Sequence, residues 1–334
     1  MTRTPAILQV SLAAGVAVGL SLGVAGLAQA PDAQRKPGYR VPRTAWGQPD
    51  IHGDYTNKDE ANTPLERPQQ LAGKDPSTFT EADLARLAAE RAAVAKQIAG
   101  GIGGAETGAG PTHWYDHLSA KGSRPWFISD PPDGRLPPMT PQAQRREAAV
   151  ALLNNARDGE GRADSTDDRS MYDRCITRGL PGSMMPAIYG NAYQIVQAPD
   201  TIAIRYEMIH ETRVIPLDGR PHVGAGVREF MGDARGRFDG DTLVVETTNF
   251  TNRTHFGYNN NYNSEKLRLV ERFTPVAPGR LNWEVTVNDP EVWTRPWTFA
   301  MTLTKDDSQP VFEYACHEGN YGLMHILQGA RAED

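Results

Sequence analysis

The chain has 334 residues, and its 35 Lys and Arg against 41 Asp and Glu give a formal net charge of −6. A mean hydropathy of −0.53 excludes a protein with many membrane spans, and 32 glycines with 25 prolines argue against a helical bundle. An acidic chain lacks the basic surplus that phosphate backbones attract, so nucleic acid is not an expected partner.

The first 30 residues have the pattern of a signal peptide. Arg3 supplies the positive charge, residues 10–28 are apolar or small, and Ala28-Gln29-Ala30 is an A-x-A cleavage site. The apolar run is long for a signal, so an uncleaved anchor is the alternative. Cleavage would leave an exported protein, periplasmic or secreted, without a stable membrane span.

Residues 31–168 are predicted to form an arm, rich in proline and glycine, that wraps the rest of the protein. It contains two predicted helices. The first covers residues 78–98, where Thr80 is a candidate N-cap, and the second covers residues 141–155 and begins at a proline. A charged linker at residues 157–168 marks the predicted boundary of the arm.

Residues 169–334 are predicted to form a mainly β domain. Short runs of alternating apolar and polar residues follow one another with turn residues between them and no helix. The predicted strands are 192–198, 201–210, 212–217, 236–240, 241–250, 266–276, 280–289 and 297–305, with 310–318 as a ninth run. This pattern favours an antiparallel up-and-down barrel, lipocalin-like, whose interior is packed or holds one small ligand; a β-sandwich is the alternative.

Both cysteines, Cys175 and Cys316, lie in the exported part of the chain. An even count in an oxidising compartment predicts one disulfide, and two separate buried thiols are the alternative. The sequence lacks the Cys and His spacing of a zinc finger.

The disulfide would bring two polar segments together, since bridged Cα atoms lie within roughly 4.4–6.8 Å. Asp173 and Arg174 would then lie near His317 and Glu318. An imidazole, two carboxylates and a guanidinium in a small volume would supply an acid, a base and an anion-binding group, with Tyr172 beside them to bind substrate. The alternative is a structural Asp173–Arg174 ion pair and a histidine that only bonds to the backbone.

A second polar cluster lies in residues 205–213. Strand alternation places Tyr206 and His210 on one face, where they would form an acid/base pair inside the barrel. The alternative is a strand with one solvated face that ends at His210. The turn at Asp218-Gly219 would bring His222 to the same rim as a substrate-binding residue.

Trp293, Arg295 and Trp297 alternate and so share one face. Alternating Trp and Arg form either a platform for a ring-shaped ligand or a stacked array in the core. Glu246 and Glu271 are interpreted as members of cross-strand charge pairs.

No cofactor and no metal site is expected. The pair His113 and His117 lacks the glutamate of the HExxH motif, and its context is a Gly- and Pro-rich loop. The sequence contains no P-loop and no dinucleotide-binding glycine motif in a strand–helix context.

The motifs DPPDGR, YDRCITRGLPG, WTRPW and CHEGNYG resemble those of a large, mostly uncharacterised family of exported bacterial proteins. The resemblance covers nearly the whole chain after the signal peptide. It implies a bacterial exported protein, but it carries over no activity, cofactor or catalytic residue.

Two functions compete. The first is an exported enzyme, a lyase, hydrolase or isomerase, that uses acid/base chemistry on a small organic or carbohydrate substrate held in the barrel. In it, His210 or His317 is the base, Tyr206 or Glu318 the acid, and Arg174 binds a substrate carboxylate or oxyanion. The second is a periplasmic lipocalin-like carrier of an apolar small molecule. A structural envelope protein is a third hypothesis that needs none of these histidines.

Overall fold

The structure, a computed structural model, describes residues 35–102, 121–155, 163–187, 189–254, 263–308 and 310–332. The predicted signal peptide lies outside these residues, as do His113 and His117.

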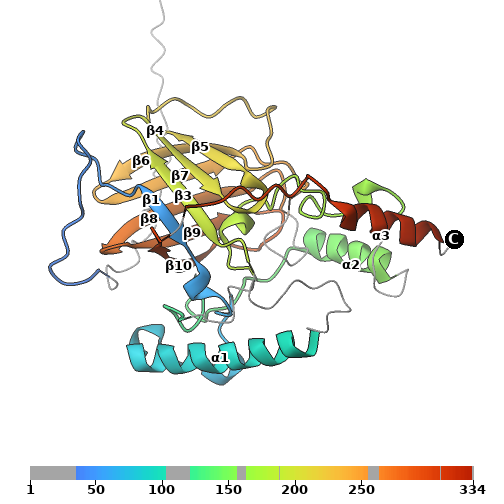
Figure 1. Cartoon of the computed structure of the whole chain (residues 1–334), viewed down its shortest axis with the longest axis horizontal. Coiled ribbons are helices and arrows are strands. Elements are labelled where there is room, and N and C mark those ends of the chain that lie inside the picture. The colour runs from blue at the N-terminus through green and yellow to red at the C-terminus, as the bar shows by residue number, and fades with distance from the viewer. Residues whose placement is uncertain are drawn as a thin grey trace, which may run out of the picture. The chain divides into compact units, whose positions relative to one another are not determined.

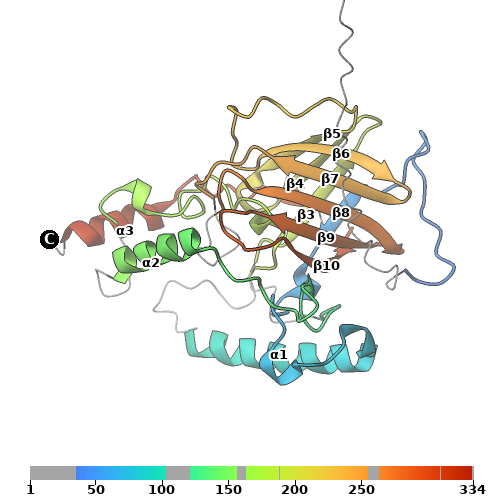
Figure 2. The same ribbon diagram turned by 180° about the vertical axis from the view of Figure 1, so that it is seen from behind.

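Ten strands form one sheet in which every neighbouring pair is antiparallel (Figures 1 and 2). In chain order they are β1 (Gly53–Thr56), β2 (Ile128–Asp130), β3 (Ala192–Gln197), β4 (Thr201–Tyr206), β5 (Thr212–Pro216), β6 (Asp233–Asp239), β7 (Thr242–Thr248), β8 (Arg268–Ala277), β9 (Arg280–Asn288) and β10 (Trp297–Lys305). The order in the sheet is β5-β4-β3-β1-β10-β9-β8-β7-β6, and β2 pairs with β10 beside this path.

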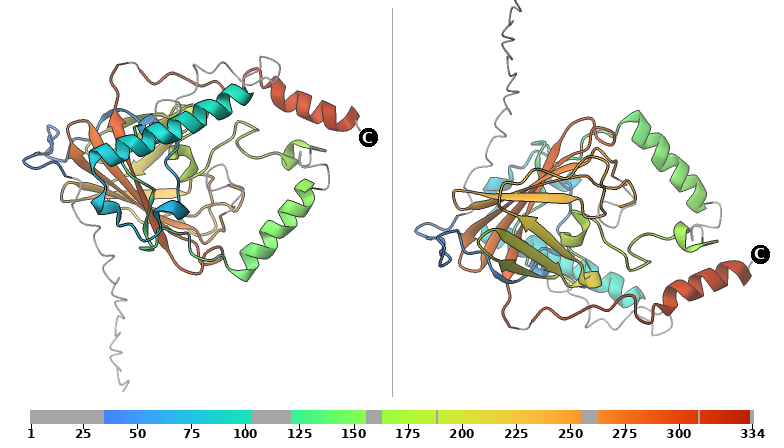
Figure 3. Two further views of the ribbon diagram at one scale, coloured as in Figure 1. Left: turned by 90° about the horizontal axis from the view of Figure 1, so that it is seen from below. Right: turned by 90° about the horizontal axis from the view of Figure 1, so that it is seen from above.

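The sheet curves into a nearly closed barrel (Figure 3). The first and last strands of this order, β5 and β6, contact each other, but no hydrogen-bond ladder joins them. Gly236 in β6 makes this contact possible. A Cβ atom at this position would lie 2.7 Å from side-chain atoms of both Ile215 and Leu217. The predicted antiparallel barrel is therefore confirmed, and the alternative β-sandwich is wrong.

The long hairpins follow the predicted alternation of buried and exposed residues. In β9, for example, Leu281, Trp283, Val285 and Val287 are buried and the residues between them are partly exposed. The turn between β8 and β9 places Gly279 at a φ of 67°, a conformation that glycine adopts without steric cost. The inward side chains are large, and they fill the barrel interior.

Two strands come from the arm, which was expected to have little regular structure. β1 pairs with β3 on one side and with β10 on the other, so it joins the two halves of the sheet. The arm also reaches the opposite side of the sheet order, where Arg35 and Arg43 both pair with Asp241 in the turn between β6 and β7.

The two predicted helices are present as α1 (Glu81–Ile102) and α2 (Pro141–Asn155). Thr80 caps α1 as predicted: its hydroxyl accepts a bond from the backbone N–H of Asp83, whose carboxylate accepts one from the backbone N–H of Thr80. None of the described helices has the length and apolar character needed to cross a membrane.

Two predicted strands need correction. The run 310–318 forms no strand and leads into a helix, α3 (Tyr321–Ala332). Both edges of β10 are already paired, so a following segment finds no free strand there. The run 201–210 is a strand only as far as Tyr206, because a tight turn follows in which the Tyr206 N–H donates to the carbonyl of Glu211 at 2.9 Å.

We expect the contact between β5 and β6 to limit the size of the side chain that position 236 can accept. Gly236→Val should lower the free energy of unfolding by about 1–3 kcal/mol, because the added methyl groups must displace packed side chains. Urea unfolding measures the change. Gly226→Val is the matched control, since a Cβ at Gly226 meets no atom within 4 Å. Equal losses in the two variants would contradict this account of the contact.

Candidate functional site

Residues 177–187, which we call the plug, pack into the barrel at the end where β4 leads into β5. Leu180 and Met184 are buried and belong to the same hydrophobic core as the inward residues of the strands. The carbonyl of Met184 accepts a bond from the Asn57 side chain at 2.7 Å. The plug is therefore part of the folded core and not a surface loop.

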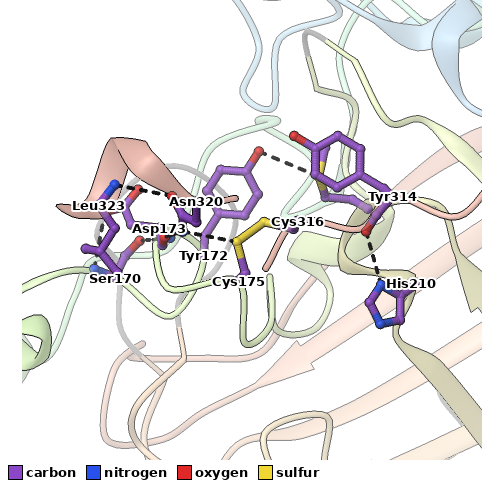
Figure 4. Close-up of a disulfide and its surroundings, with 10 residues drawn as sticks. Ser170, Tyr172, Asp173, Cys175, His210, Tyr314, Cys316, Asn320 and Leu323 are labelled. Carbon is purple, nitrogen blue, oxygen red and sulfur yellow. Dashed lines mark hydrogen bonds between the residues drawn. A yellow bond between two sulfur atoms is a disulfide. The ribbon is translucent and has the colours of Figure 1, made fainter. Parts of the chain in front are cut away.

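The predicted disulfide between Cys175 and Cys316 is confirmed, with Cα atoms 5.6 Å apart (Figure 4). It ties Cys175, two residues before the plug, to the segment that precedes α3. Asn320 supports the link, since its side-chain amide donates to the carbonyl of Asp173 at 3.0 Å and contacts the sulfur of Cys175 at 3.4 Å.

The polar side chains around the disulfide do not form the predicted acid/base group. Arg174 pairs with Asp167 at 2.9 Å, and Asp173 is bound by the residues three and four positions before it. His317 and Glu318 are exposed. No hydrogen bond or ion pair joins them to Asp173 or Arg174 within the described part of the chain. The disulfide brings the two segments together, but Arg174 and Asp173 bond to residues close to them in the sequence and not to His317 or Glu318.

The aromatic residues that were predicted to bind substrate lie in packed positions. Trp293 and Trp297 are buried, with ring centroids 5.9 Å apart in an edge-to-face arrangement, so they form core and not a ligand platform. Tyr172 contacts the sulfur of Met208 at 3.8 Å, and the guanidinium of Arg178 lies over its ring.

Tyr206 and His210 do not share a face, contrary to the prediction. After Tyr206, which is buried in the core, the chain turns, and Ile209 and His210 adopt φ values of 66° and 48°. Such values strain a β-branched residue, and strain of this kind clusters at functional sites. The turn leaves His210 exposed, where its Nδ1 bonds to the carbonyl of Tyr314 at 3.1 Å, and it directs Glu211 toward the plug.

Glu211 is the residue in this region with the most unusual chemistry. Its carboxylate accepts a bond from the Thr177 hydroxyl of the plug at 2.7 Å. Burial raises the pKa of Glu211 from 4.5 to about 7, although the bond from Thr177 opposes the rise. Because the side chain stays partly exposed, protons can be exchanged with solvent or with a ligand.

A buried ion pair lies farther inside the barrel. Arg213 and Glu271 are 3% and 0% exposed, and two bonds join them, one of them 3.1 Å long. Arg213 also donates to the Thr247 hydroxyl at 2.7 Å, and the indole N–H of Trp283 donates to Glu271 at 3.2 Å. Burial beside this pair raises the pKa of Tyr206, so that its hydroxyl keeps its proton at neutral pH. The pair and its bonds to Thr247 and Trp283 hold strands β5, β7, β8 and β9 together inside the barrel.

His222 lies outside the barrel interior, on the outer side of β6 and β7. Its Nδ1 is 2.9 Å from a carboxylate oxygen of Asp233, and its Nε2 is 3.8 Å from Glu246. No hydrogen bond or ion pair among the described residues joins it to Glu211.

The described residues form no group of three or more His, Cys, Asp or Glu side chains that could hold a metal ion. A small pocket of about 90 Å³ lies beside β1, lined in part by Tyr55, Lys58, Asp306 and Phe312. A second pocket, of about 40 Å³, lies between α2 and the residues that follow β9.

Sequence reasoning missed Glu211 and the inward position of Arg213. Arg213 and Ile215 alternate in β5 and both are buried, a pattern in which a charged residue on an apolar face signals a buried ion pair. For Glu211 the sequence offers no signal, because its environment is created by Thr177, which lies in another segment.

The chain matches no protein-family model and no curated protein. A comparison with solved structures found a mutant of the fluorescent protein UnaG, with 11% sequence identity and a TM-score of 0.21; the match covers 34% of this chain and 70% of that one. A likeness this weak carries no information about function.

We expect the disulfide to stabilise the plug. The double variant Cys175→Ser/Cys316→Ser should lose about 2–5 kcal/mol of unfolding free energy, because the bridge links residues 141 positions apart. Urea unfolding tests this. The wild type treated with a thiol reductant should show the same midpoint as the variant, and an unchanged midpoint in both would contradict the expected role.

Proposed function

We propose that this protein is an exported enzyme that uses acid/base chemistry on a small organic or carbohydrate substrate, with Glu211 as the group that transfers the proton. The reaction class is a lyase, hydrolase or isomerase, since each of these can be driven by proton transfer at a single positioned carboxyl group. The proposed location is the periplasm or the exterior of a bacterial cell, in line with the signal-like first 30 residues and the disulfide.

One observation carries the proposal, namely the position of the Glu211 carboxylate, partly buried at the junction of the plug and the barrel and bonded to the Thr177 hydroxyl at 2.7 Å. A group whose pKa lies near the operating pH is present both as acid and as base, which is the condition for efficient proton transfer. Raised carboxyl pKa values at partly exposed positions are typical of catalytic sites.

The surroundings of Glu211 support this role. Thr177 fixes the position of the carboxylate from one side, and the strained turn at Ile209 fixes it from the other. Preorganised groups of this kind reduce the cost of reaching a reactive geometry. A substrate would approach from the exposed side of Glu211, next to His210, because packed side chains fill the barrel interior.

The filled interior also gives less support to the carrier hypothesis. A lipocalin-like carrier needs an apolar cavity that encloses most of its ligand. The pockets of about 40 and 90 Å³ are too small to enclose such a ligand, and the larger is lined by several charged residues.

The first test is turnover. We expect a screen of lignin-derived aromatic compounds, terpenoids and uronic oligosaccharides to reveal an activity that Glu211→Gln reduces by about 10²–10⁴-fold, because the amide cannot exchange the proton. His317→Ala serves as the control, since its side chain is exposed and has no contact with Glu211; it should retain the wild-type rate. Full activity in Glu211→Gln would contradict the proposal.

The second test is the pH dependence of stability. Between pH 4.5 and about 7 the folded state binds a proton at Glu211 that the unfolded state has lost, so the free energy of unfolding should fall as the pH rises through this range. The raised pKa corresponds to as much as about 3 kcal/mol. Relative to wild type, Glu211→Gln should therefore become more stable between pH 5 and pH 8 in urea unfolding. A constant difference would show that Glu211 titrates in its ordinary range.

A further inference from the structure

The loop between β5 and β6 is exposed but firmly anchored. The Asn249 side chain, in a residue with a φ of 59°, donates to the carbonyls of Val223, Gly224 and Val227 at 3.0–3.2 Å. One amide group thus holds three points of the loop. An exposed loop with this degree of internal support is preorganised, as binding loops are.

The start of the same loop is held by β6. Arg235 donates to the carbonyls of Arg220 and Pro221, with distances between 2.8 and 3.2 Å. Asp233 accepts a bond from the backbone N–H of Val223 at 2.9 Å. These bonds fix the backbone on both sides of His222.

The contact with Asp233 determines which nitrogen of the His222 ring carries a hydrogen. Because a carboxylate oxygen only accepts, the Nδ1 atom 2.9 Å away must carry a hydrogen. In the neutral ring Nε2 is then an acceptor. It faces a second acceptor, the carboxylate of Glu246, at 3.8 Å. This separation is too long for a hydrogen bond between them, so a ligand with two donors could bond to both atoms.

The charges around His222 are balanced. Asp233 pairs with Arg235 at 2.5 Å, and Glu246 pairs with Arg268 at 2.6 Å. Each carboxylate therefore has its own guanidinium, and the site has no surplus negative charge to attract an amine or a metal ion. The partner that fits two converging acceptors in a neutral setting is a pair of hydroxyl groups.

The loop also offers apolar surface beside these acceptors. Val223 is 39% exposed and Val227 is 52% exposed, while His222 is partly exposed at 26% of its side chain. A sugar presents hydroxyl groups at its edges and C–H groups on its faces, so it can use both kinds of contact.

We propose that His222 and Glu246, with the loop residues Val223 and Val227, form a binding site for a neutral polyhydroxylated ligand such as a sugar, in which two neighbouring hydroxyls donate to His222 Nε2 and to Glu246. Asp233 is a positioning residue that acts through the His222 ring. This site is distinct from the one around Glu211 and does not depend on the proposed enzymatic function.

The test is NMR titration of the full-length protein with methyl β-glucopyranoside and with xylotetraose, up to tens of millimolar. We expect saturable shifts of the His222 ring signals and of the Val223 and Val227 methyl signals. His222→Ala should weaken binding by at least about tenfold, because it removes one acceptor. Asp233→Asn should also weaken binding and should change the ring tautomer, which nitrogen chemical shifts report.

The control is Asp239→Asn. Asp239 pairs with Arg272 on the same outer side of the sheet, at the other end of β6, and its replacement should leave binding unchanged. The His222, Val223 and Val227 signals report this site, whereas turnover reports Glu211, so failure of one proposal does not entail failure of the other. An absence of saturable shifts with both sugars would overturn the proposal. So would equal binding by His222→Ala, or shifts that arise only with spermidine or zinc.

Discussion

The insertion of the plug into the barrel is the constraint on which the rest of this structure depends. Leu180 and Met184 complete the hydrophobic core at one end, and the same segment carries Thr177 to within 2.7 Å of Glu211. If the plug were elsewhere, Glu211 would be an ordinary surface carboxylate with an ordinary pKa. The disulfide fixes one side of the plug, and Asn57, from the turn after β1, holds the other. The position of the plug thus determines both how this end of the core packs and the pKa of Glu211, and the disulfide helps to hold the plug there.

The barrel separates two kinds of buried charge. Inside, Arg213 and Glu271 pair with each other and bond to Thr247 and Trp283, so both charges have fixed partners within the core. At the edge, Glu211 has no cationic partner among its described contacts; burial raises its pKa, and the bond from Thr177 opposes the rise. The difference explains why we assign chemistry to the carboxylate at the edge and stability to the one inside.

Sequence reasoning was most successful where the signal is periodic and local. Strand β9 and most of β8 alternate between buried and more exposed residues, and the helices α1 and α2 have clear start signals. It failed for β1, whose four residues are too few to show a period, and at the end of β4, where the sequence continues to alternate but a strained turn intervenes. The disulfide was predictable from the even number of cysteines and the predicted compartment. The side chains that meet near it were not, because proximity of the backbone does not determine which partners a side chain selects.

The position of β1 also determines when the molecule can be completed. Tyr55 lies opposite Lys305 on one side and Tyr193 on the other, so a strand from the first described segment is held between strands that are synthesised much later. The sheet cannot acquire its full set of ladders until β10 has emerged from the ribosome, because its earliest strand must wait for its last.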